Sequence, residues 1–446
     1  MSVRAQGLLR RWASGLGLVA ASATLAAAQG RPFGAPGLAQ PVRPARPAPA
    51  APTAPGNTAA GRLGVTSRFR YEGVEQSNLP SHADAATLRT RIGYLTPRVG
   101  KLRGTLEGEH IAIVGPPDRF NAAGAAGPAS RPVVADPETI ELNQAWISYG
   151  EGQRLMLRGG RQRITLENHR FVGDVGWRQN MQTFDALVAE GRPTRDLELW
   201  YGYVWGVNRV FGNVNTLPAA SPNRDFDSRS HLLHATYSGW RAARVVGYGY
   251  FLDLRHEAGN ANSVATLGAE LAGSRQLDAR STVGYRAEFA RQTDYALSPH
   301  RFATTYASAE GNATIARWSA GVGTERLGSG RDQNGTGRVG FRTPLSTAHA
   351  FNGWADAFLN TPAEGLDDRY GFVQVMLPHN VPLRVIHHRF RTATTGDAWG
   401  SETDLIATWQ IGSHLGVLAK YATYHGVRAP LAYDSRKAWL QFDLTF

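Results

Sequence analysis

The last eleven residues of the chain, Arg436-Lys-Ala-Trp-Leu-Gln-Phe-Asp-Leu-Thr-Phe446, decide the fold. Apolar side chains recur at every second position and end on an aromatic residue, while polar residues and one tryptophan occupy the alternate positions. Because successive side chains of a strand point to opposite faces, this segment predicts a β-strand with one apolar and one mixed face. Such a strand at the end of a chain indicates the closing strand of an outer-membrane β-barrel. We expect its assembly signal for the barrel assembly machinery to be Phe442, Leu444 and Phe446.

The same period-two alternation runs through the chain from about residue 63, in stretches of about ten residues, the length that a tilted membrane-spanning strand needs. Leu197–Trp205 and Val283–Phe289 are good examples. We predict an all-β fold, an antiparallel transmembrane barrel of 18 strands, with 16 as the alternative. We assign Gly337–Phe341 to a loop, because another strand would make the number odd. The strands are expected to start near residues 63, 86, 102, 139, 154, 182, 196, 230, 243, 262, 279, 301, 315, 369, 382, 401, 415 and 435.

The strands of a soluble β-sandwich also alternate apolar and polar residues, but nothing in a sandwich requires short connections to alternate with long ones. Here short links alternate with long polar ones such as 114–138, 207–229 and 327–368, as expected for periplasmic turns and external loops. The barrel is therefore favoured, with both chain ends in the periplasm. The short links are expected at residues 97–101, 150–153, 191–195, 239–242, 273–278, 311–314, 378–381 and 412–414.

The N-terminus predicts export. Arginines at positions 4, 10 and 11 precede an apolar stretch that ends in Ala26-Ala27-Ala28, which is the pattern of a secretory signal peptide. Residues 29–61 are rich in proline and alanine and show no periodicity, so we interpret them as a disordered periplasmic leader. The three predicted parts are thus residues 1–28, residues 29–61 and the barrel, residues 62–446.

Charge and cysteine content exclude several classes of protein. The chain has no cysteine, so disulfides, thiolate metal sites and cysteine catalysis are excluded. Its net charge is +12, but six of its 48 basic residues lie in residues 1–60, which hold no acidic residue. The rest of the chain therefore carries 42 basic against 36 acidic residues. This modest and scattered excess, on an exported chain, argues against nucleic-acid binding.

Two stretches on the external side do not alternate and are rich in specific side chains. They are Gly160–Asn180, which leads into Thr183-Phe184-Asp185, and Phe341–Asp356. A solvated surface loop would not need so many aromatic residues, so we predict that both fold into the barrel and narrow it. The residues expected to pack these loops are Phe171, Trp177, Asn180, Phe351, Asn352, Trp354 and Asp356.

These two stretches resemble the alginate-export family of outer-membrane porins. The resemblance rests on Gly160-Arg161-Gln162, on Asn168 with Arg170–Gly173, and on Gly176–Asn180 leading to Asp185. It also rests on Thr343-Pro344-Leu345 and on Phe351–Asp356. Elsewhere, from about residue 62 to Phe446, the similarity lies only in the pattern.

The resemblance implies a monomeric 18-stranded barrel with a constricted, arginine-lined, anion-selective pore. By motif position, Arg161, Arg170, Arg178 and Asp185 would form the constriction. The chain departs from the family pattern at His169 and Asp174, and Asp174 adds a negative charge. In the alginate exporter a long periplasmic turn plugs the channel, whereas the corresponding turn here is only Gly412-Ser413-His414. An open channel for smaller solutes is therefore favoured.

Alternation independently places a set of arginines in the lumen, since each arginine facing lipid at mid-membrane would cost about 2–4 kcal/mol. Their positive field would attract carboxylates in a narrow passage. The alternative is that they pair with inward glutamates and merely brace the wall. The set consists of Arg68, Arg70, Arg89, Arg91, Arg103, Arg158, Arg286 and Arg317.

We expect a passive outer-membrane channel for small anionic or saccharide solutes, without cofactor, metal site or catalytic residue, in contact with outer-membrane lipid and lipopolysaccharide. The alternatives are an exporter of an acidic polysaccharide, a barrel-embedded enzyme and a purely structural or adhesive barrel. Catalysis is disfavoured because His387 and His388 are adjacent on one strand and face opposite ways. The acidic pieces 225–227 and 367–368 lack the ligand spacing of a calcium loop.

Overall fold

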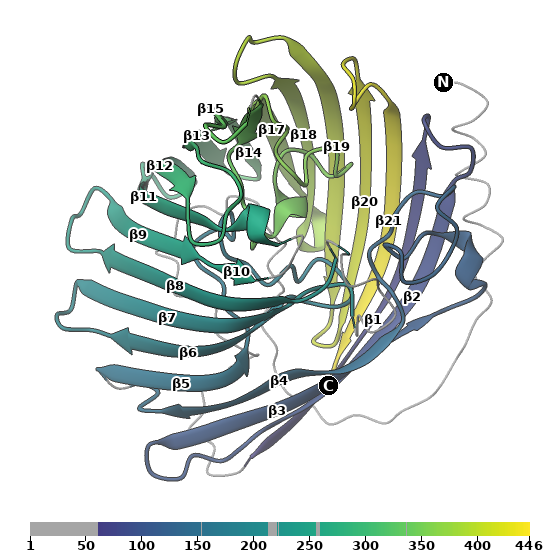
Figure 1. The fold of residues 1–446 in the computed structure, drawn as a ribbon. Coiled ribbons are helices and arrows are strands. Elements are labelled where there is room, and N and C mark those ends of the chain that lie inside the picture. Colours follow the sequence, from purple (N-terminus) through teal and green to yellow (C-terminus); the bar gives the residue numbers. More distant parts are fainter. Residues whose placement is uncertain (1–60, 153, 213–220, 222, 256–258, 336) are drawn as a thin grey trace. The chain divides into compact units, whose positions relative to one another are not determined.

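A computed structural model describes residues 61–446 except 153, 213–220, 222, 256–258 and 336. The expected signal peptide and all but the last residue of the expected leader lie outside the described residues. Where the chain is described, every strand pairing of the main sheet is antiparallel, and the sheet closes into a barrel of 18 strands when β10 is counted as the continuation of β9 (Figure 1). The predicted fold class is confirmed.

The barrel strands follow the chain order around the sheet. Their bounds are β1 Arg62–Gln76, β2 Ala83–Leu95, β3 Leu102–Ile113, β4 Thr139–Tyr149, β5 Leu155–Gln162, β6 Thr183–Gly191, β7 Leu197–Asn208, β8 Phe226–Tyr237, β9 Arg244–Leu252, β10 Leu254–Arg255, β11 Val264–Gln276, β12 Ser281–Asp294, β13 Ala303–Ile315, β14 Trp318–Leu327, β17 Leu366–Leu377, β18 Val381–Arg391, β19 Ala398–Ile411, β20 Leu415–Gly426 and β21 Asp434–Thr445.

Smaller elements decorate the connections. A two-stranded hairpin pairs β15 with β16, and single turns of 3-10 helix lie in several connections. None of the helices in the described part of the chain is long and apolar enough to cross a membrane. The bounds are β15 Ser329–Arg331, β16 Arg338–Gly340, η1 Pro117–Arg119, η3 Asn260–Asn262, η4 Ala348–Ala350 and η5 Pro378–Asn380.

The closing strand is the segment from which the fold was predicted. β21 pairs with β1 from Thr66 opposite Thr445 to Gln76 opposite Ser435, and Phe446 extends this pairing through two hydrogen bonds with Val65. The ring of Phe442 lies against Phe69 across the seam at 6.4 Å, and Leu444 and Phe446 are exposed. Both ends of the barrel chain lie on the side of the short turns, which in such barrels is the periplasmic side.

Alternation along the strands separates an apolar outer face from a polar inner one. On β12, Tyr285 and Phe289 are exposed while Glu288 between them is buried. An exposed apolar band around a sheet is the surface that lipid covers in a transmembrane barrel. Its members include Leu88, Ile92, Leu106, Ile147, Leu187, Leu199, Leu233, Leu267, Val322, Val373, Val385 and Leu405.

All 18 predicted strands are present, and each begins within four residues of its predicted start. The turn expected at residues 311–314 is wrong: these residues belong to β13, and Ala316-Arg317 makes the turn. Likewise, β11 continues to Gln276 through most of the turn expected at 273–278. The segment expected as a loop at 337–341 includes β16, which pairs with β15 outside the barrel sheet.

Candidate channel constriction

The first inward loop, residues 163–182, connects β5 to β6. Near its start, Glu167 accepts a hydrogen bond from His234 of β8 at 2.8 Å and pairs with Arg244 of β9. Near its end, Arg178 pairs with Glu72 of β1 at 3.0 Å. Because these strands belong to distant parts of the wall, the loop must run through the barrel interior.

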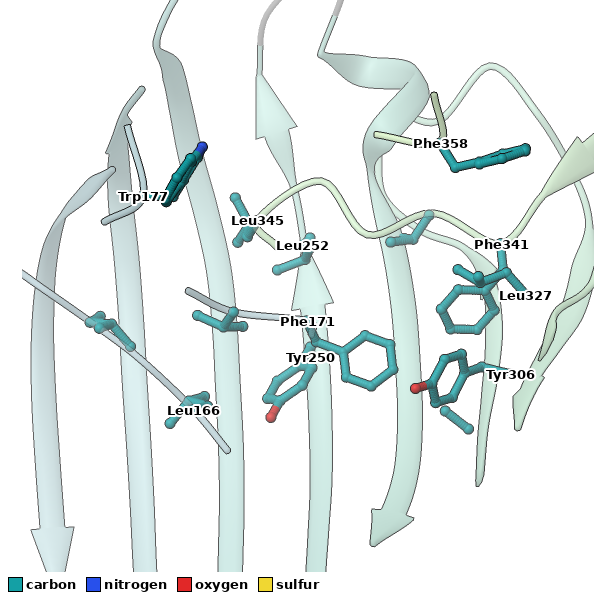
Figure 2. Packing of buried hydrophobic residues seen from close by; sticks show 14 of the residues in the cluster. Leu166, Phe171, Trp177, Tyr250, Leu252, Tyr306, Leu327, Phe341, Leu345 and Phe358 are labelled. Carbon is teal, nitrogen blue, oxygen red and sulfur yellow. The ribbon is translucent and has the colours of Figure 1, made fainter. Parts of the chain in front are cut away.

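Aromatic packing holds the middle of this loop. The ring of Phe171 lies 5.1 Å from that of Tyr306, 5.4 Å from Tyr248 and 5.9 Å from Phe341. Figure 2 shows Phe171 between Tyr250 and Tyr306, with Phe341 beside them. Burying these rings against one another stabilises the loop inside the barrel, whereas a loop exposed to solvent gains no such stabilisation. Phe171 thus lies within a cluster of aromatic rings from the barrel wall and the second inward stretch.

The second inward loop, residues 341–365, connects β16 to β17 and lies against the first. Val172 and Leu345 form a parallel β-bridge, and the Gly173 amide donates to the Leu345 carbonyl at 2.8 Å. The Thr347 amide donates to the carbonyl of His169 at 3.0 Å. These backbone bonds join the two loops into one unit, which we call the plug.

The plug holds strained backbone. Val175 has a φ of 48°, which is costly for a β-branched residue, and Asn352 and Asp356 also have positive φ, 55° and 63°. The Val175 amide donates to the Thr347 hydroxyl at 3.1 Å, so contact between the two loops helps to maintain its conformation. Backbone of this kind persists only where its surroundings enforce it.

A lysine in a tryptophan cage anchors the plug to the wall. The Lys420 ammonium of β20 lies 3.7 Å from the ring of Trp354, 4.2 Å from Trp177 and 5.3 Å from Trp439. Its nitrogen is 2.7 Å from His349 Nε2. A desolvated cation surrounded by aromatic faces is a strong contact. Both loops are thereby attached to β20 and β21.

Asp356 is the charged partner of this cage. It accepts from His349 Nδ1 and from the Lys437 ammonium, each at 2.6 Å, and lies 3.3 Å from Arg178. Burial alone would raise the pKa of Asp356, but His349, Lys437 and Arg178 outweigh it and hold the pKa well below its usual value. Burial lowers the pKa of His349 well below its usual value. A neutral His349 can therefore donate to Asp356 while accepting from Lys420.

Arg170 and Arg178 serve as buried attachments of the plug. Arg170 is 3% exposed, pairs with Glu325 of β14 at 2.8 Å and donates to Asn352 at 3.0 Å. Its guanidinium also covers the half-buried Phe351 ring at 4.7 Å. Arg178 is 6% exposed and has Glu72, Asp136 and Asp356 within 4 Å.

Arg161 and Asp185 form a more open pair on the neighbouring strands β5 and β6. They make two hydrogen bonds of 2.8 and 3.0 Å, and the Arg161 side chain is 28% exposed. Asn180, at the end of the first inward loop, is fully buried and donates weakly to the Arg209 carbonyl at 3.5 Å. The four motif residues are thus not one ring of charges.

The negative charge of Asp174, where the chain departs from the family pattern, is neutralised by neighbouring residues. Asp174 pairs with Arg163 and accepts from the Gly176 amide at 3.0 Å. Burial opposes its ionisation, but Arg163 and His169 prevail, and the pKa of Asp174 lies below its usual value. Asp174 therefore contributes little free negative charge to the lumen.

Most arginines expected on the wall do face inward, and most are paired with acids. Arg317 is the exception in position, because it lies in the turn between β13 and β14 and not on a strand, so its expected place on the lumen wall is wrong. The pairs are Arg68–Asp443 at 2.7 Å, Arg70–Asp136 at 3.6 Å, Arg91–Glu109, Arg103–Glu151 at 3.9 Å, Arg158–Glu151 at 3.1 Å and Arg286–Glu270 at 2.6 Å.

Arg89 differs from its neighbours. It lies on β2 directly opposite Arg68 of β1, and Arg91 follows two residues later on the same face. Its side chain is buried, its Nε has no hydrogen-bond partner, and it makes no ion pair with the described residues. Among the described residues, these three adjacent guanidiniums thus pair with only two carboxylates, those of Asp443 and Glu109.

Sequence reasoning missed five residues that hold the plug, four of them on wall strands and one, Asp136, in the connection before β4. Glu72, Asp136, Glu402, Lys420 and Lys437 were not singled out, although each contacts a plug residue. One signal was available: Lys420 and Lys437 are two of only three lysines among 48 basic residues. Where arginine is so dominant, a lysine at an inward strand position deserves a specific explanation.

Comparison with known proteins agrees with this architecture. The alginate-export family matches residues 118–417, about two thirds of the chain. No curated protein matches the sequence.

Several solved outer-membrane structures share the fold at low identity. OccAB4 of Acinetobacter baumannii has a TM-score of 0.63 at 10% identity, covering 87% of this chain and 99% of that one. OccK9 (OpdG) of Pseudomonas aeruginosa has a TM-score of 0.64 at 13% identity, with coverages of 86% and 98%. OpdK of the same organism, solved with vanillate, gives 0.62 at 11% identity with the same coverages. The family match and the closed 18-stranded barrel together show that the chain belongs to the alginate-export family of outer-membrane β-barrel proteins.

Proposed function

We propose that this protein is a passive channel for small anionic solutes, such as carboxylates or acidic sugars. The observation that carries the proposal is the group formed by Arg68, Arg89 and Arg91, in which Arg89 has no acidic partner among the described residues. An unpaired guanidinium inside a narrow, low-dielectric barrel raises the local concentration of anions, even where the side chain itself is buried. The vanillate in the OpdK structure, itself a carboxylate, is consistent with such a solute.

Arginines have two different tasks in this proposal. Arg170 and Arg178 are buried in acidic pockets and position the plug, which sets the width of the passage. Arg89 supplies uncompensated charge, and the more exposed Arg161 and Asp185 offer a polar surface to a passing solute. A channel is favoured over an enzyme because most of the inward charged side chains pair with one another or hold the plug and are not arranged as a catalytic group.

Liposome swelling with two matched solutes tests the proposal. Vanillate and vanillyl alcohol share a skeleton and differ in charge. We expect vanillate to enter faster, and we expect Arg89→Ala to reduce this preference roughly twofold, because one focusing charge is lost. Arg436→Ala, which removes an outward arginine near Glu75, is the control and should leave the ratio unchanged. Equal entry of both solutes into wild-type liposomes would contradict an anion channel.

Export of an acidic polysaccharide is the second candidate, favoured by the match to the alginate-export family. The three-residue turn between β19 and β20 argues for an unplugged periplasmic mouth, and the ion-paired plug argues for small solutes. Swelling assays with uronic acid monomers and longer uronate oligomers separate the two. Faster passage of monomers supports the small-solute channel, whereas equally fast passage of long oligomers supports export.

A further inference from the structure

An arginine cluster lies on the outer face of the barrel, away from the lumen. Arg326 of β14, Arg369 of β17, and Arg389 and Arg391 of β18 are all exposed. Alternation fixes their direction, since the residues beside them on the same strands, Glu325, Asp368, His388 and Phe390, are buried. We call these four residues the outer arginine cluster.

Strand register brings the four guanidiniums together. β17 pairs with both β14 and β18, so Asp367 lies between Arg326 and Arg391, and Arg369 lies directly opposite Arg389. Neighbouring strands are about 4.8 Å apart, and alternate residues of one strand are about 7 Å apart. The whole cluster therefore fits beneath a single headgroup.

The cluster has too few acids to neutralise it. Asp367 lies 3.6 Å from Arg326 and 3.2 Å from Arg369 Nε. Of the residues with described positions, the Arg391 side chain contacts only the Gly396 carbonyl, by a hydrogen bond of 3.4 Å. The Arg389 side chain makes no ion pair or hydrogen bond with the residues that the structure describes. Like charges directly opposite each other on a sheet are destabilising. Four guanidiniums with one carboxylate thus call for an anion from outside the chain.

The surroundings identify what kind of anion fits. β14 and β18 end at the cluster and β17 begins there, on the side of the long connections, which is the extracellular side. Farther along the same outer faces, Val322, Val373 and Val385 are exposed and belong to the apolar band. A ligand in this place would therefore meet positive charge at one end and hydrocarbon at the other.

We propose that the outer arginine cluster binds the phosphate of a phosphorylated glycolipid in the outer leaflet, with the acyl chains along the valines below. Guanidinium groups match phosphate oxygens in bidentate geometry, which favours arginine at such a site. The apolar band distinguishes a lipid from free phosphate, which would gain nothing from it. The site is independent of the lumen and of the solute that passes through it.

Native mass spectrometry of the full chain in detergent tests this assignment with two probes, lipid A carrying its phosphates and enzymatically dephosphorylated lipid A. We expect the phosphorylated form to bind wild type at least about tenfold more tightly, and Arg369→Ala/Arg389→Ala to remove most of that difference. Arg280→Ala, in the periplasmic turn between β11 and β12, is the matched control and should bind as wild type does.

Two further variants keep the test decisive. Arg389→Ala alone removes a side chain that has no ion pair or hydrogen bond within the described part of the chain, so it should fold and should still weaken binding several-fold. Arg389→Lys keeps the charge and should weaken binding less. Equal binding of both lipids to wild type, or unchanged binding of phosphorylated lipid A to the folded Arg389→Ala and double variants, would overturn the proposal.

Discussion

At the residue scale, Arg178 illustrates how much of the site depends on buried pairing. It meets Glu72, Asp136 and Asp356, and each of these acids is itself buried. Removing one partner from such a group leaves uncompensated charge, at a cost of about 3–5 kcal/mol. Arg170 next to Glu325 follows the same logic.

Arg178→Met should therefore release the first inward loop. We expect hydrogen exchange in residues 163–182 to accelerate by more than a hundredfold, because docking is weakened by about 3–5 kcal/mol. Arg161→Met is the control, since its partly exposed pair with Asp185 contributes only about 1 kcal/mol or less. Similar exchange in the two variants would show that the buried pairs do not hold the plug.

The pH dependence of the plug follows from Asp356. Its pKa in the folded protein lies well below the usual value for aspartate, about 4. Its contribution to stability is thus fully present above that usual value and is lost only as the pH falls through the lower folded-state pKa. We expect exchange protection of residues 341–358, corrected for intrinsic rates, not to fall between pH 7 and pH 5.

Asp356→Asn provides the comparison at both pH values. The neutral side chain leaves Lys437 and Arg178 with less compensation, so protection of the second inward loop should be lower than in wild type at pH 7 and at pH 5. A wild-type protection that already falls between pH 7 and pH 5 would contradict the low pKa of Asp356.

At the scale of elements, the strands could be predicted and the turns only in part. Alternation of lipid-facing and lumen-facing residues is enforced along every strand, so β7 and β12 can be read directly from their residues. The turn expected at Gly311–Thr314 was wrong because Gly311 belongs to the barrel wall, where it pairs with Tyr285 and Val322. The true turn, Ala316-Arg317, has no residue type that is typical of turns.

The inward loops were predictable from their aromatic residues, but their attachments were not. The cage around Lys420 brings together Trp177, Trp354 and Trp439 from three distant parts of the chain. No local pattern specifies which side chains meet across a barrel interior. The same holds for Arg89, which has no acidic partner in the described ranges because the register of β1 against β2 places Arg68 opposite it.

Gly353 allows a test of whether packing against β19 holds the second inward loop in place. Its φ is +84°, and a Cβ there would lie 2.3 Å from the Glu402 carboxylate, which accepts the Ala355 amide at 2.6 Å. Gly396 has a similar φ of +80° but open space around it. Both alanine variants should suffer backbone strain of roughly 1–3 kcal/mol. Gly353→Ala should accelerate hydrogen exchange around Ala355 by more than this strain alone explains, because it also disturbs the contact with Glu402.

Gly396→Ala is the matched control in that experiment. Local exchange changes of equal size around the two substituted positions would mean that only the backbone conformation matters and that the contact with Glu402 does not hold the loop. A larger change for Gly353→Ala would support the packing of this loop on β19.

At the scale of the whole molecule, the closed barrel and the plug have different roles. The wall isolates a polar interior from lipid, and the plug, attached by Arg170, Arg178 and the Lys420 cage, narrows that interior. Replacing residues 165–180 by a short glycine and serine linker should raise single-channel conductance about twofold or more, because a constriction limits ion flow. An unchanged conductance would place the narrowest point elsewhere.

The most direct test of the central proposal is the reversal potential of the wild-type protein in a planar bilayer under a potassium chloride gradient. We predict stepwise conductance and a reversal potential whose sign indicates preference for chloride over potassium, because Arg89 and its neighbours leave the passage positive. Absence of conductance, or a reversal potential that favours potassium, would contradict a passive channel for anions.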